Sequence, residues 1–209
     1  MYLTINGEKR KFHEMEMVVL EQGITNLFAS FDKKTLGELV LQKKYEHLGG
    51  YIEQHVPQLL DLPAGAALKK MKDQGHTYYK HFLNNYGDLT YARFTVNGDP
   101  ELLKQHGIYT IVVDDELMFC GICARTFKER FNQHIGTIYA KGCFRDGTAT
   151  HCHINAHITQ KLAISSITFA VYPMTDKREM NRMKNAIIKR FEPEWNLRAS
   201  KELFEVTGV

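Results

Sequence analysis

The sequence lacks the long apolar runs, dense cysteines and repeats that mark several classes of protein. No stretch approaches the ~18 consecutive apolar residues of a membrane span, so we expect no membrane association. The first residues, MYLTINGEKRKF, contain no apolar core of a secretion signal. Four cysteines in 209 residues are too few for a disulfide scaffold, which favours a cytoplasmic protein. Without repeats or low-complexity tracts, collagen, coiled-coil and disordered classes are excluded.

The remaining composition, 44% hydrophobic and 24% charged residues, is typical of a soluble globular protein with one large domain or two small ones. The net charge is +3, and it is unevenly distributed. Residues 1–100 are neutral, whereas residues 124–198 hold 13 basic and 6 acidic side chains, a net charge of +7. Such a basic segment indicates a polyanionic partner, although solvated helix faces would produce the same excess.

The first half of the chain is predicted to be mostly helical. A short hairpin is expected at the start, with Asn6-Gly7 as its turn. From Glu14 to about Leu60, apolar residues recur three and four apart, which predicts helices, and a further helix is expected over 66–71. A strand is predicted over 88–96. The turn-forming sequence NGDP at 97–100 then marks the expected domain boundary, between residues 1–100 and 101–209.

The second half is predicted to be a small α/β unit. Apolar runs at 107–113 and 117–122 indicate two strands of a hairpin. Thr126 and Glu129 form a capping-box pattern that starts a helix extending to about residue 135. A helix near 154–162, a strand over 166–172 and a last helix over 177–191 follow, and Pro193 stops that last helix.

Several short motifs in this unit follow one another at characteristic spacings. Gly107-Ile108-Tyr109 lies on the first predicted strand, Phe119-Cys120-Gly121 ends the second, and Phe127-Lys128-Glu129-Arg130-Phe131 is followed by His134 on the helix. The last helix leads into Ile188-Lys189-Arg190-Phe191-Glu192-Pro193-Glu194-Trp195-Asn196. Over about residues 107–198 the chain resembles the GIY-YIG nuclease superfamily. The resemblance implies a three-stranded, mainly antiparallel sheet flanked by helices, here preceded by a mostly helical domain for DNA recognition or dimerisation.

The residue types suit phosphodiester cleavage, which needs an activated water, a cation for the developing charge and usually a divalent metal. By resemblance, Tyr109 is the general base, Arg130 the phosphate clamp, His134 a proton-transfer or phosphate-contact residue, and Asn196 a residue that orients the site. Each has a plainer alternative, as a core tyrosine, a solvated arginine, a surface histidine and a helix-end cap. The candidate DNA-binding residues are Arg125, Lys128, Lys189, Arg190 and Arg198.

Two positions depart from the family pattern. The second-strand tyrosine is replaced by Phe119, which keeps the ring and loses the hydroxyl. Twelve residues before Asn196, where the family has a metal-binding glutamate, the chain has Lys184, whose ammonium cannot coordinate Mg²⁺. Thus no intact metal ligand is predicted, and Mg²⁺ or Mn²⁺ is expected only for a form with glutamate at that position. Three explanations are open: an introduced or selected inactivating change, a natural protein that binds DNA without cutting, or a different register.

The cysteines and histidines permit one further site. Cys120 and Cys123 form a C-x-x-C motif, and Cys143 and Cys152 follow, with histidines at 151, 153 and 157. Four of these could hold zinc, but the spacings match no common zinc module, and a free cysteine packs well in a strand.

The sequence as a whole predicts a metal-dependent DNA endonuclease that hydrolyses phosphodiester bonds. About 100 residues precede the nuclease-like segment and few follow it, which favours a restriction-type enzyme. A double-strand cut needs two active sites, so a homodimer on double-stranded DNA is expected. The alternatives are a non-catalytic DNA-binding protein on the same fold and an interaction module that matches the motif by coincidence.

Overall fold

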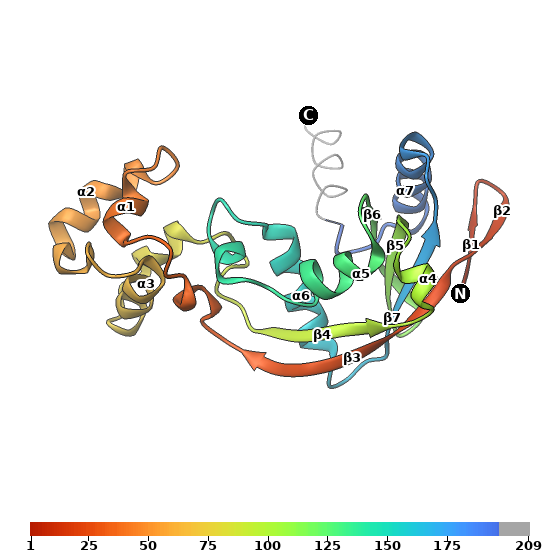
Figure 1. Ribbon diagram of the computed structural model, residues 1–209, viewed down its shortest axis with the longest axis horizontal. Coiled ribbons are helices and arrows are strands. Elements are labelled where there is room, and N and C mark those ends of the chain that lie inside the picture. Colours follow the sequence, from red (N-terminus) through yellow and green to blue (C-terminus); the bar gives the residue numbers. More distant parts are fainter. Residues whose placement is uncertain (197–209) are drawn as a thin grey trace, which may run out of the picture. The chain divides into compact units, whose positions relative to one another are not determined.

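The computed structural model describes residues 1–196, which form an α/β architecture with antiparallel strand pairs (Figure 1). Its strands are β1 (Tyr2–Ile5), β2 (Glu8–Lys11), β3 (His13–Ile24), β4 (Tyr91–Asn97), β5 (Gly107–Val113), β6 (Glu116–Cys123) and β7 (Ile167–Pro173). Its α-helices are α1 (Leu36–Val40), α2 (Glu46–His55), α3 (Ala64–Asp73), α4 (Pro100–Leu103), α5 (Phe127–Glu129), α6 (Ala149–Lys161) and α7 (Lys177–Phe191). Short 3₁₀ helices are η1 (Leu27–Ser30), η2 (Pro57–Leu59), η3 (Thr77–Phe82) and η5 (Ala140–Cys143), and η4 (Arg130–Ile135) is a π-helix.

The chain divides into two compact units whose boundaries differ from the predicted cut at residue 100. Unit 1 comprises Met1–Leu20, Phe94–Gly136 and the described residues from Gln160 onward, and unit 2 comprises Glu21–Arg93 and Thr137–Thr159. The difference has a packing reason. Residues of the first hairpin pack in the core of unit 1, whereas residues 138–156 contribute side chains to the helical core of unit 2.

The main sheet has five strands in the order β4-β3-β7-β5-β6, rather than the three that the sequence predicts. The three expected strands are adjacent, and β5 pairs antiparallel with both β6 and β7. In these ladders Tyr109 lies opposite Gly121 on one side and Val171 on the other. The strands β3 and β4 extend the sheet beyond β7.

The helix predicted from Glu14 is wrong at its start, because β3 continues to residue 24. Glutamate and methionine alternate at 14–17, which puts Met15 in the core, where it is 3% exposed. Two β-branched valines follow at 18 and 19, and such side chains fit a pleated strand. Helices begin only after this strand.

Several local predictions are confirmed. The strands β1 and β2 form the expected hairpin, and Asn6 and Gly7 take the positive φ angles of its turn. The helix α7 runs over the predicted residues, and Pro193 follows its end. The capping box of Thr126 and Glu129 is complete.

The helix after this capping box is not a regular α-helix. One turn, α5, is followed by the π-helical η4, in which the Gly136 amide donates to the Phe131 carbonyl five residues earlier. Gly136 is required at this point, since a Cβ would lie 2.2 Å from the Phe94 carbonyl oxygen. The π-turn therefore ends at a glycine because the backbone of β4 approaches it closely at Phe94.

The sheet of unit 1 is covered on both faces. On one face, Met180, Met183 and Ile187 of α7 pack with Ile108 and Cys120. Side chains alternate along a strand, so Tyr109, between two residues of that face, points to the other. There its ring contacts Phe131 of η4, which also contacts Phe169 of β7.

Both edge strands of the five-stranded sheet are closed by asparagine amides. On β4, Asn155 accepts from the Ala92 amide at 3.0 Å and donates to the Ala92 carbonyl at 2.8 Å. On β6, Asn196 makes the same pair of bonds with Cys120, at 2.8 Å and 2.9 Å. An edge strand otherwise presents unpaired peptide groups.

We predict that Asn155→Ala lowers the free energy of unfolding by about 2–4 kcal/mol, because each buried peptide group left unpaired costs roughly 1–3 kcal/mol. Both Ala92 and Asn155 are buried. Urea denaturation followed by circular dichroism measures the loss. The control is Asn85→Ala at an exposed position, with an expected change within about 0.5 kcal/mol. Equal stability of the two variants would contradict the role of Asn155.

Candidate functional site

The site predicted around Tyr109 lies on the face of the sheet that η4 covers. The Tyr109 ring is buried, with 4% of the residue exposed, and it lies over Gly121 of the neighbouring strand. A Cβ at Gly121 would lie 2.7 Å from the Tyr109 hydroxyl oxygen and 2.6 Å from the adjacent ring carbon. Glycine at this position is therefore a steric requirement of the tyrosine.

Two aromatic rings fix the orientation of Tyr109. The ring of Phe119 lies 5.6 Å away in a tilted arrangement, and that of Phe131 lies 5.6 Å away edge-on. Such contacts are typical of buried aromatic pairs. Phe119 thus packs against Tyr109 without supplying a hydroxyl.

Arg130 provides the positive charge of this site. Its guanidinium carbon lies 5.6 Å from the centroid of the Tyr109 ring, a cation–π contact, and the side chain is half-buried. The fold thus brings Arg130 and Tyr109 into contact, although 21 positions separate the two in the sequence.

The Tyr109 hydroxyl is a poor base in this arrangement. Burial raises its pKa above the ordinary value, and the nearby Arg130 charge only partly opposes the rise. The hydroxyl is therefore protonated at neutral pH and available as a hydrogen-bond donor. A general-base role requires a further group that lowers its pKa.

A thiol that the sequence reasoning did not assign to this site lies beside it. The Cys123 thiol donates to the carbonyl oxygens of Thr126 at 3.1 Å and Arg125 at 3.5 Å. Burial raises its pKa, and Arg130 opposes that rise by its charge and a hydrogen bond. Cys123 lies opposite Gly107 in the β5–β6 ladder, and this pairing places its side chain on the same face of the sheet as Tyr109.

His134 lies in the same electrostatic environment. Its pKa is lowered from the ordinary value by burial first, and then by the charges of Arg130 and Arg125, while Glu129 acts in the opposite direction. Its imidazole is therefore neutral at pH 7, so it can accept a proton on one ring nitrogen and donate a hydrogen bond from the other. Glu129 is held by the Thr126 cap, which lowers its pKa, and by Arg125 at 3.7 Å.

Lys184 lies away from this group, on the α7 side of the sheet. It occupies the same helix as the buried stripe of Met180, Met183 and Ile187, and its charge acts on Cys120. Burial raises the pKa of that thiol to about 12, and Lys184 moderates the rise. Because Cys120 and Tyr109 project from opposite faces, the structure brings Lys184 to β6 but not to the Tyr109 ring.

Asn196 has a structural position at the edge of the sheet. Its amide is occupied by both peptide groups of Cys120, and the neighbouring Trp195 amide donates to the Met118 carbonyl at 2.9 Å. Trp195 is buried. The pair attaches the segment after α7 to β6, which is consistent with a supporting role; the Asn196 side chain bonds to a strand and does not cap the end of α7.

The candidate DNA-binding residues form two groups. Arg125 and Lys128 are exposed at the start of α5, and Lys189 and Arg190 are exposed at the end of α7. The two helices cover opposite faces of the sheet, so these side chains do not form one surface. Arg198 lies outside the described residues.

The residues present do not fit a divalent metal. Within residues 1–196 no group of three histidine, cysteine or acidic side chains is placed to hold a metal ion. Cys120 and Cys123 are three positions apart on a strand and therefore project from opposite faces. All four cysteines are buried free thiols.

Comparison of the chain with known proteins found no matching protein family, no matching curated protein and no matching solved structure. In the part of the chain that the structure describes, no helix combines the length and apolar character of a membrane span. The functional argument consequently depends on the geometry of the residues themselves.

We predict that His134 titrates below its ordinary pKa of ~6.5, and that Arg130→Gln raises this pKa because a neighbouring cation is removed. Since charging the folded histidine is unfavourable, its contribution reduces stability as the pH falls below ~6.5, and the reduction is smaller in the variant. Imidazole proton or carbon shifts in an NMR titration measure the midpoint. Lys128→Gln, an exposed cation on the same turn, is the control and leaves it unchanged.

Proposed function

We propose that the protein is a DNA endonuclease of the GIY-YIG type, most similar to a restriction enzyme, whose cleavage requires a carboxylate at position 184. The supporting observation is the contact between the Arg130 guanidinium and the Tyr109 ring. The ring lies over Gly121, where any side chain would collide with the tyrosine. These are the residues that the motif singles out, and they come from three different elements.

The chemistry follows from the charges of this group. Hydrolysis of a phosphodiester places additional negative charge on the phosphoryl oxygens, and Arg130 offers a permanent, planar cation to stabilise it. The neutral His134 can accept a proton from an attacking water, and the imidazolium formed in that way can then give the proton to a leaving oxygen. The protonated Tyr109 hydroxyl can donate to a phosphate oxygen in the same region.

Within the described residues, the side chains around Tyr109 and Arg130 include no carboxylate free to bind the metal that this type of hydrolysis uses. Mg²⁺ prefers carboxylate oxygens, and position 184 carries an ammonium instead. Glu129 is not a substitute, because its carboxylate is held by the Thr126 cap and by Arg125. The proposal is therefore that the protein with Lys184 binds DNA and does not cut it efficiently.

The partner in this proposal is double-stranded DNA, and a homodimer is needed to cut both strands. The basic group at the start of α5 and the basic group at the end of α7 would contact phosphates. A second candidate, a non-catalytic DNA-binding protein on the same fold, is favoured by two residues, Lys184 and Phe119. The two candidates differ in whether a carboxylate at position 184 permits cleavage.

We predict that Lys184→Glu creates Mg²⁺-dependent cleavage of DNA and that the protein with Lys184 shows almost none. The carboxylate would lie beside Cys120, one residue along β6 from Phe119, and would supply an oxygen ligand in place of a repelling charge. The assay uses both proteins, DNA of phage length carrying many sequences, and Mg²⁺ or Mn²⁺ added or chelated.

A matched control separates the position from the charge. Lys177→Glu makes the same charge change at an exposed position of α7 outside the candidate DNA-binding residues, and it should not create activity. Efficient cutting by the protein with Lys184 would show that another acid binds the metal. If Lys184→Glu binds DNA but remains inactive on all substrates, the non-catalytic candidate is supported instead.

We predict that Arg130→Ala in the Lys184→Glu background lowers cleavage by at least ~10²-fold, because transition-state charge stabilisation by an arginine is typically worth several kcal/mol. Circular dichroism should show an unchanged fold. Lys104→Ala in the same background removes an exposed cation of unit 1 that is not a candidate DNA-binding residue, and it should change cleavage much less. Near-normal cleavage by the Arg130 variant would remove Arg130 from the proposed site.

A further inference from the structure

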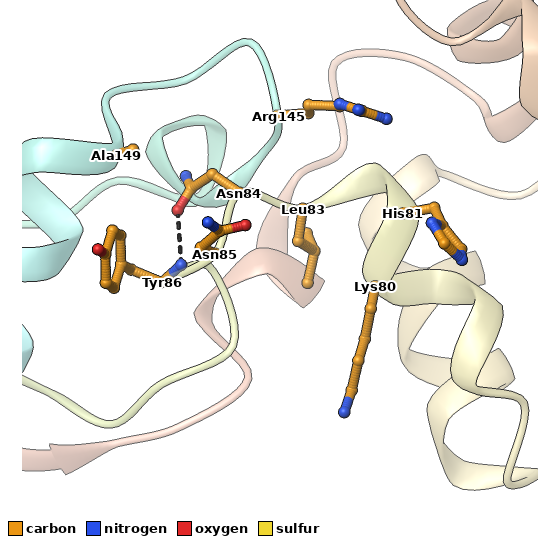
Figure 2. A pocket seen from close by; sticks show the side chains of 8 residues that line it. All are labelled: Lys80, His81, Leu83, Asn84, Asn85, Tyr86, Arg145 and Ala149. Carbon is orange, nitrogen blue, oxygen red and sulfur yellow. Dashed lines mark hydrogen bonds between the residues drawn. The ribbon is translucent and has the colours of Figure 1, made fainter. Parts of the chain in front are cut away.

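Unit 2 contains a hollow of about 320 Å³ that none of the motif residues enters. Its wall includes Lys80, His81, Asn84, Asn85, Tyr86 and Arg145 (Figure 2). These residues come from two segments, one at η3 and the following loop and the other just before α6. All of the residues that line the hollow belong to unit 2, whereas Tyr109 and Arg130 belong to unit 1.

Hydrogen bonds fix the two segments together beneath the hollow. The Asn84 amide nitrogen donates to the carbonyl oxygens of Gly142 at 2.7 Å and Phe144 at 3.2 Å, and its oxygen accepts from the Tyr86 amide at 2.9 Å. The Arg145 amide donates to the Phe82 carbonyl at 2.9 Å. The wall is therefore a bonded structure rather than two independent loops.

The charge of this wall has one sign. Lys80, His81 and Arg145 line the hollow, and no aspartate or glutamate is among its described lining residues. A second hollow of unit 2, about 600 Å³, differs in this respect, because Asp32 and Asp146 share its wall with lysines. The first hollow is thus the one that favours an anion.

Other side chains of unit 2 hold the basic groups in place. The His81 ring packs against Tyr78 at 4.8 Å, and Tyr78 stacks on Tyr51 of α2 at 3.6 Å. Arg145 lies 3.3 Å from a ring nitrogen of His47, also on α2. These contacts limit the range over which each group moves.

Figure 2 shows that the Lys80, His81 and Arg145 side chains lie apart and do not converge on one point. Two separated cations, Lys80 and Arg145, suit successive phosphates along a chain better than a single phosphate. We propose that this hollow binds the sugar-phosphate backbone of duplex DNA, with the exposed side-chain amide of Asn85 available to donate a hydrogen bond beside the cations, while Asn84 holds the wall together. This inference rests on the proposed function in taking DNA as the partner, but it does not require cleavage.

The test measures DNA affinity of the full chain against salt concentration, using a short duplex and fluorescence anisotropy. Lys80→Gln/Arg145→Gln removes two charges from the hollow, and Lys43→Gln/Lys44→Gln removes two exposed charges elsewhere in unit 2. Each lost phosphate contact reduces the steepness of the negative slope of log K against log[salt] by ~0.9, so the slope of the first variant should be shallower than that of the parent by ~1.8. The second variant should keep the slope of the parent.

A charge-conserving pair, Lys80→Arg/Arg145→Lys, should retain the slope, which separates charge from a folding defect. If the parent slope is steep but all variants share it, the inference is overturned and the proposed function stands. A flat plot for the parent overturns both. If inorganic phosphate alone binds, with loss in the Gln pair while duplex affinity is unchanged, the hollow is a small-anion site and the inference is also overturned. The expected slopes together with an inactive Lys184→Glu protein support the inference and reject only the endonuclease.

Discussion

The peptide groups at the open edges of a β-sheet must find partners, and this constraint organises unit 1. On β4 the amide of Phe94 donates to the carbonyl of Gly136, which ends η4, and the amide of Val96 donates to the side chain of Asn132 within η4. A turn that makes those bonds has to cross the sheet, and on the way its Phe131 ring contacts Tyr109. The irregular π-helical winding thus joins edge closure to the position of Arg130.

Strand alternation then decides which residues can act together. Tyr109, Phe119 and Arg130 share one face, whereas Cys120 and the Lys184 charge belong to the other. A motif written as one line of sequence is therefore divided between two faces of a sheet. Any chemistry that needs both groups must take place around the rim of β6, where the segment after α7 is attached.

Sequence reasoning succeeds where local bonds decide the structure. The Asn6-Gly7 turn and the Thr126 cap depend on residues within a few positions, and both are present. The strand β3 was misassigned because its membership of the sheet depends on partners far along the chain, such as the pairing of Met15 with Phe169. The π-turn was equally inaccessible, since it depends on the Phe94 carbonyl meeting Gly136. For the site, the motif resemblance named Tyr109 and Arg130 separately, and their contact emerged only from the fold; the side of the sheet on which the thiol at 123 lies likewise follows only from the strand register.

The charge at position 184 gains its meaning from this geometry. A lysine is tolerated at this half-buried position because the stem of a lysine can lie along an apolar surface, such as the stripe of α7, while its ammonium stays in water. A glutamate at position 184 would place a negative charge near Cys120, and under the proposed function a divalent cation shared with a DNA phosphate would compensate that charge. The ammonium of Lys184 would instead contact the phosphate directly. In the proposed function, this one side chain separates a protein that binds DNA from one that can also cut it.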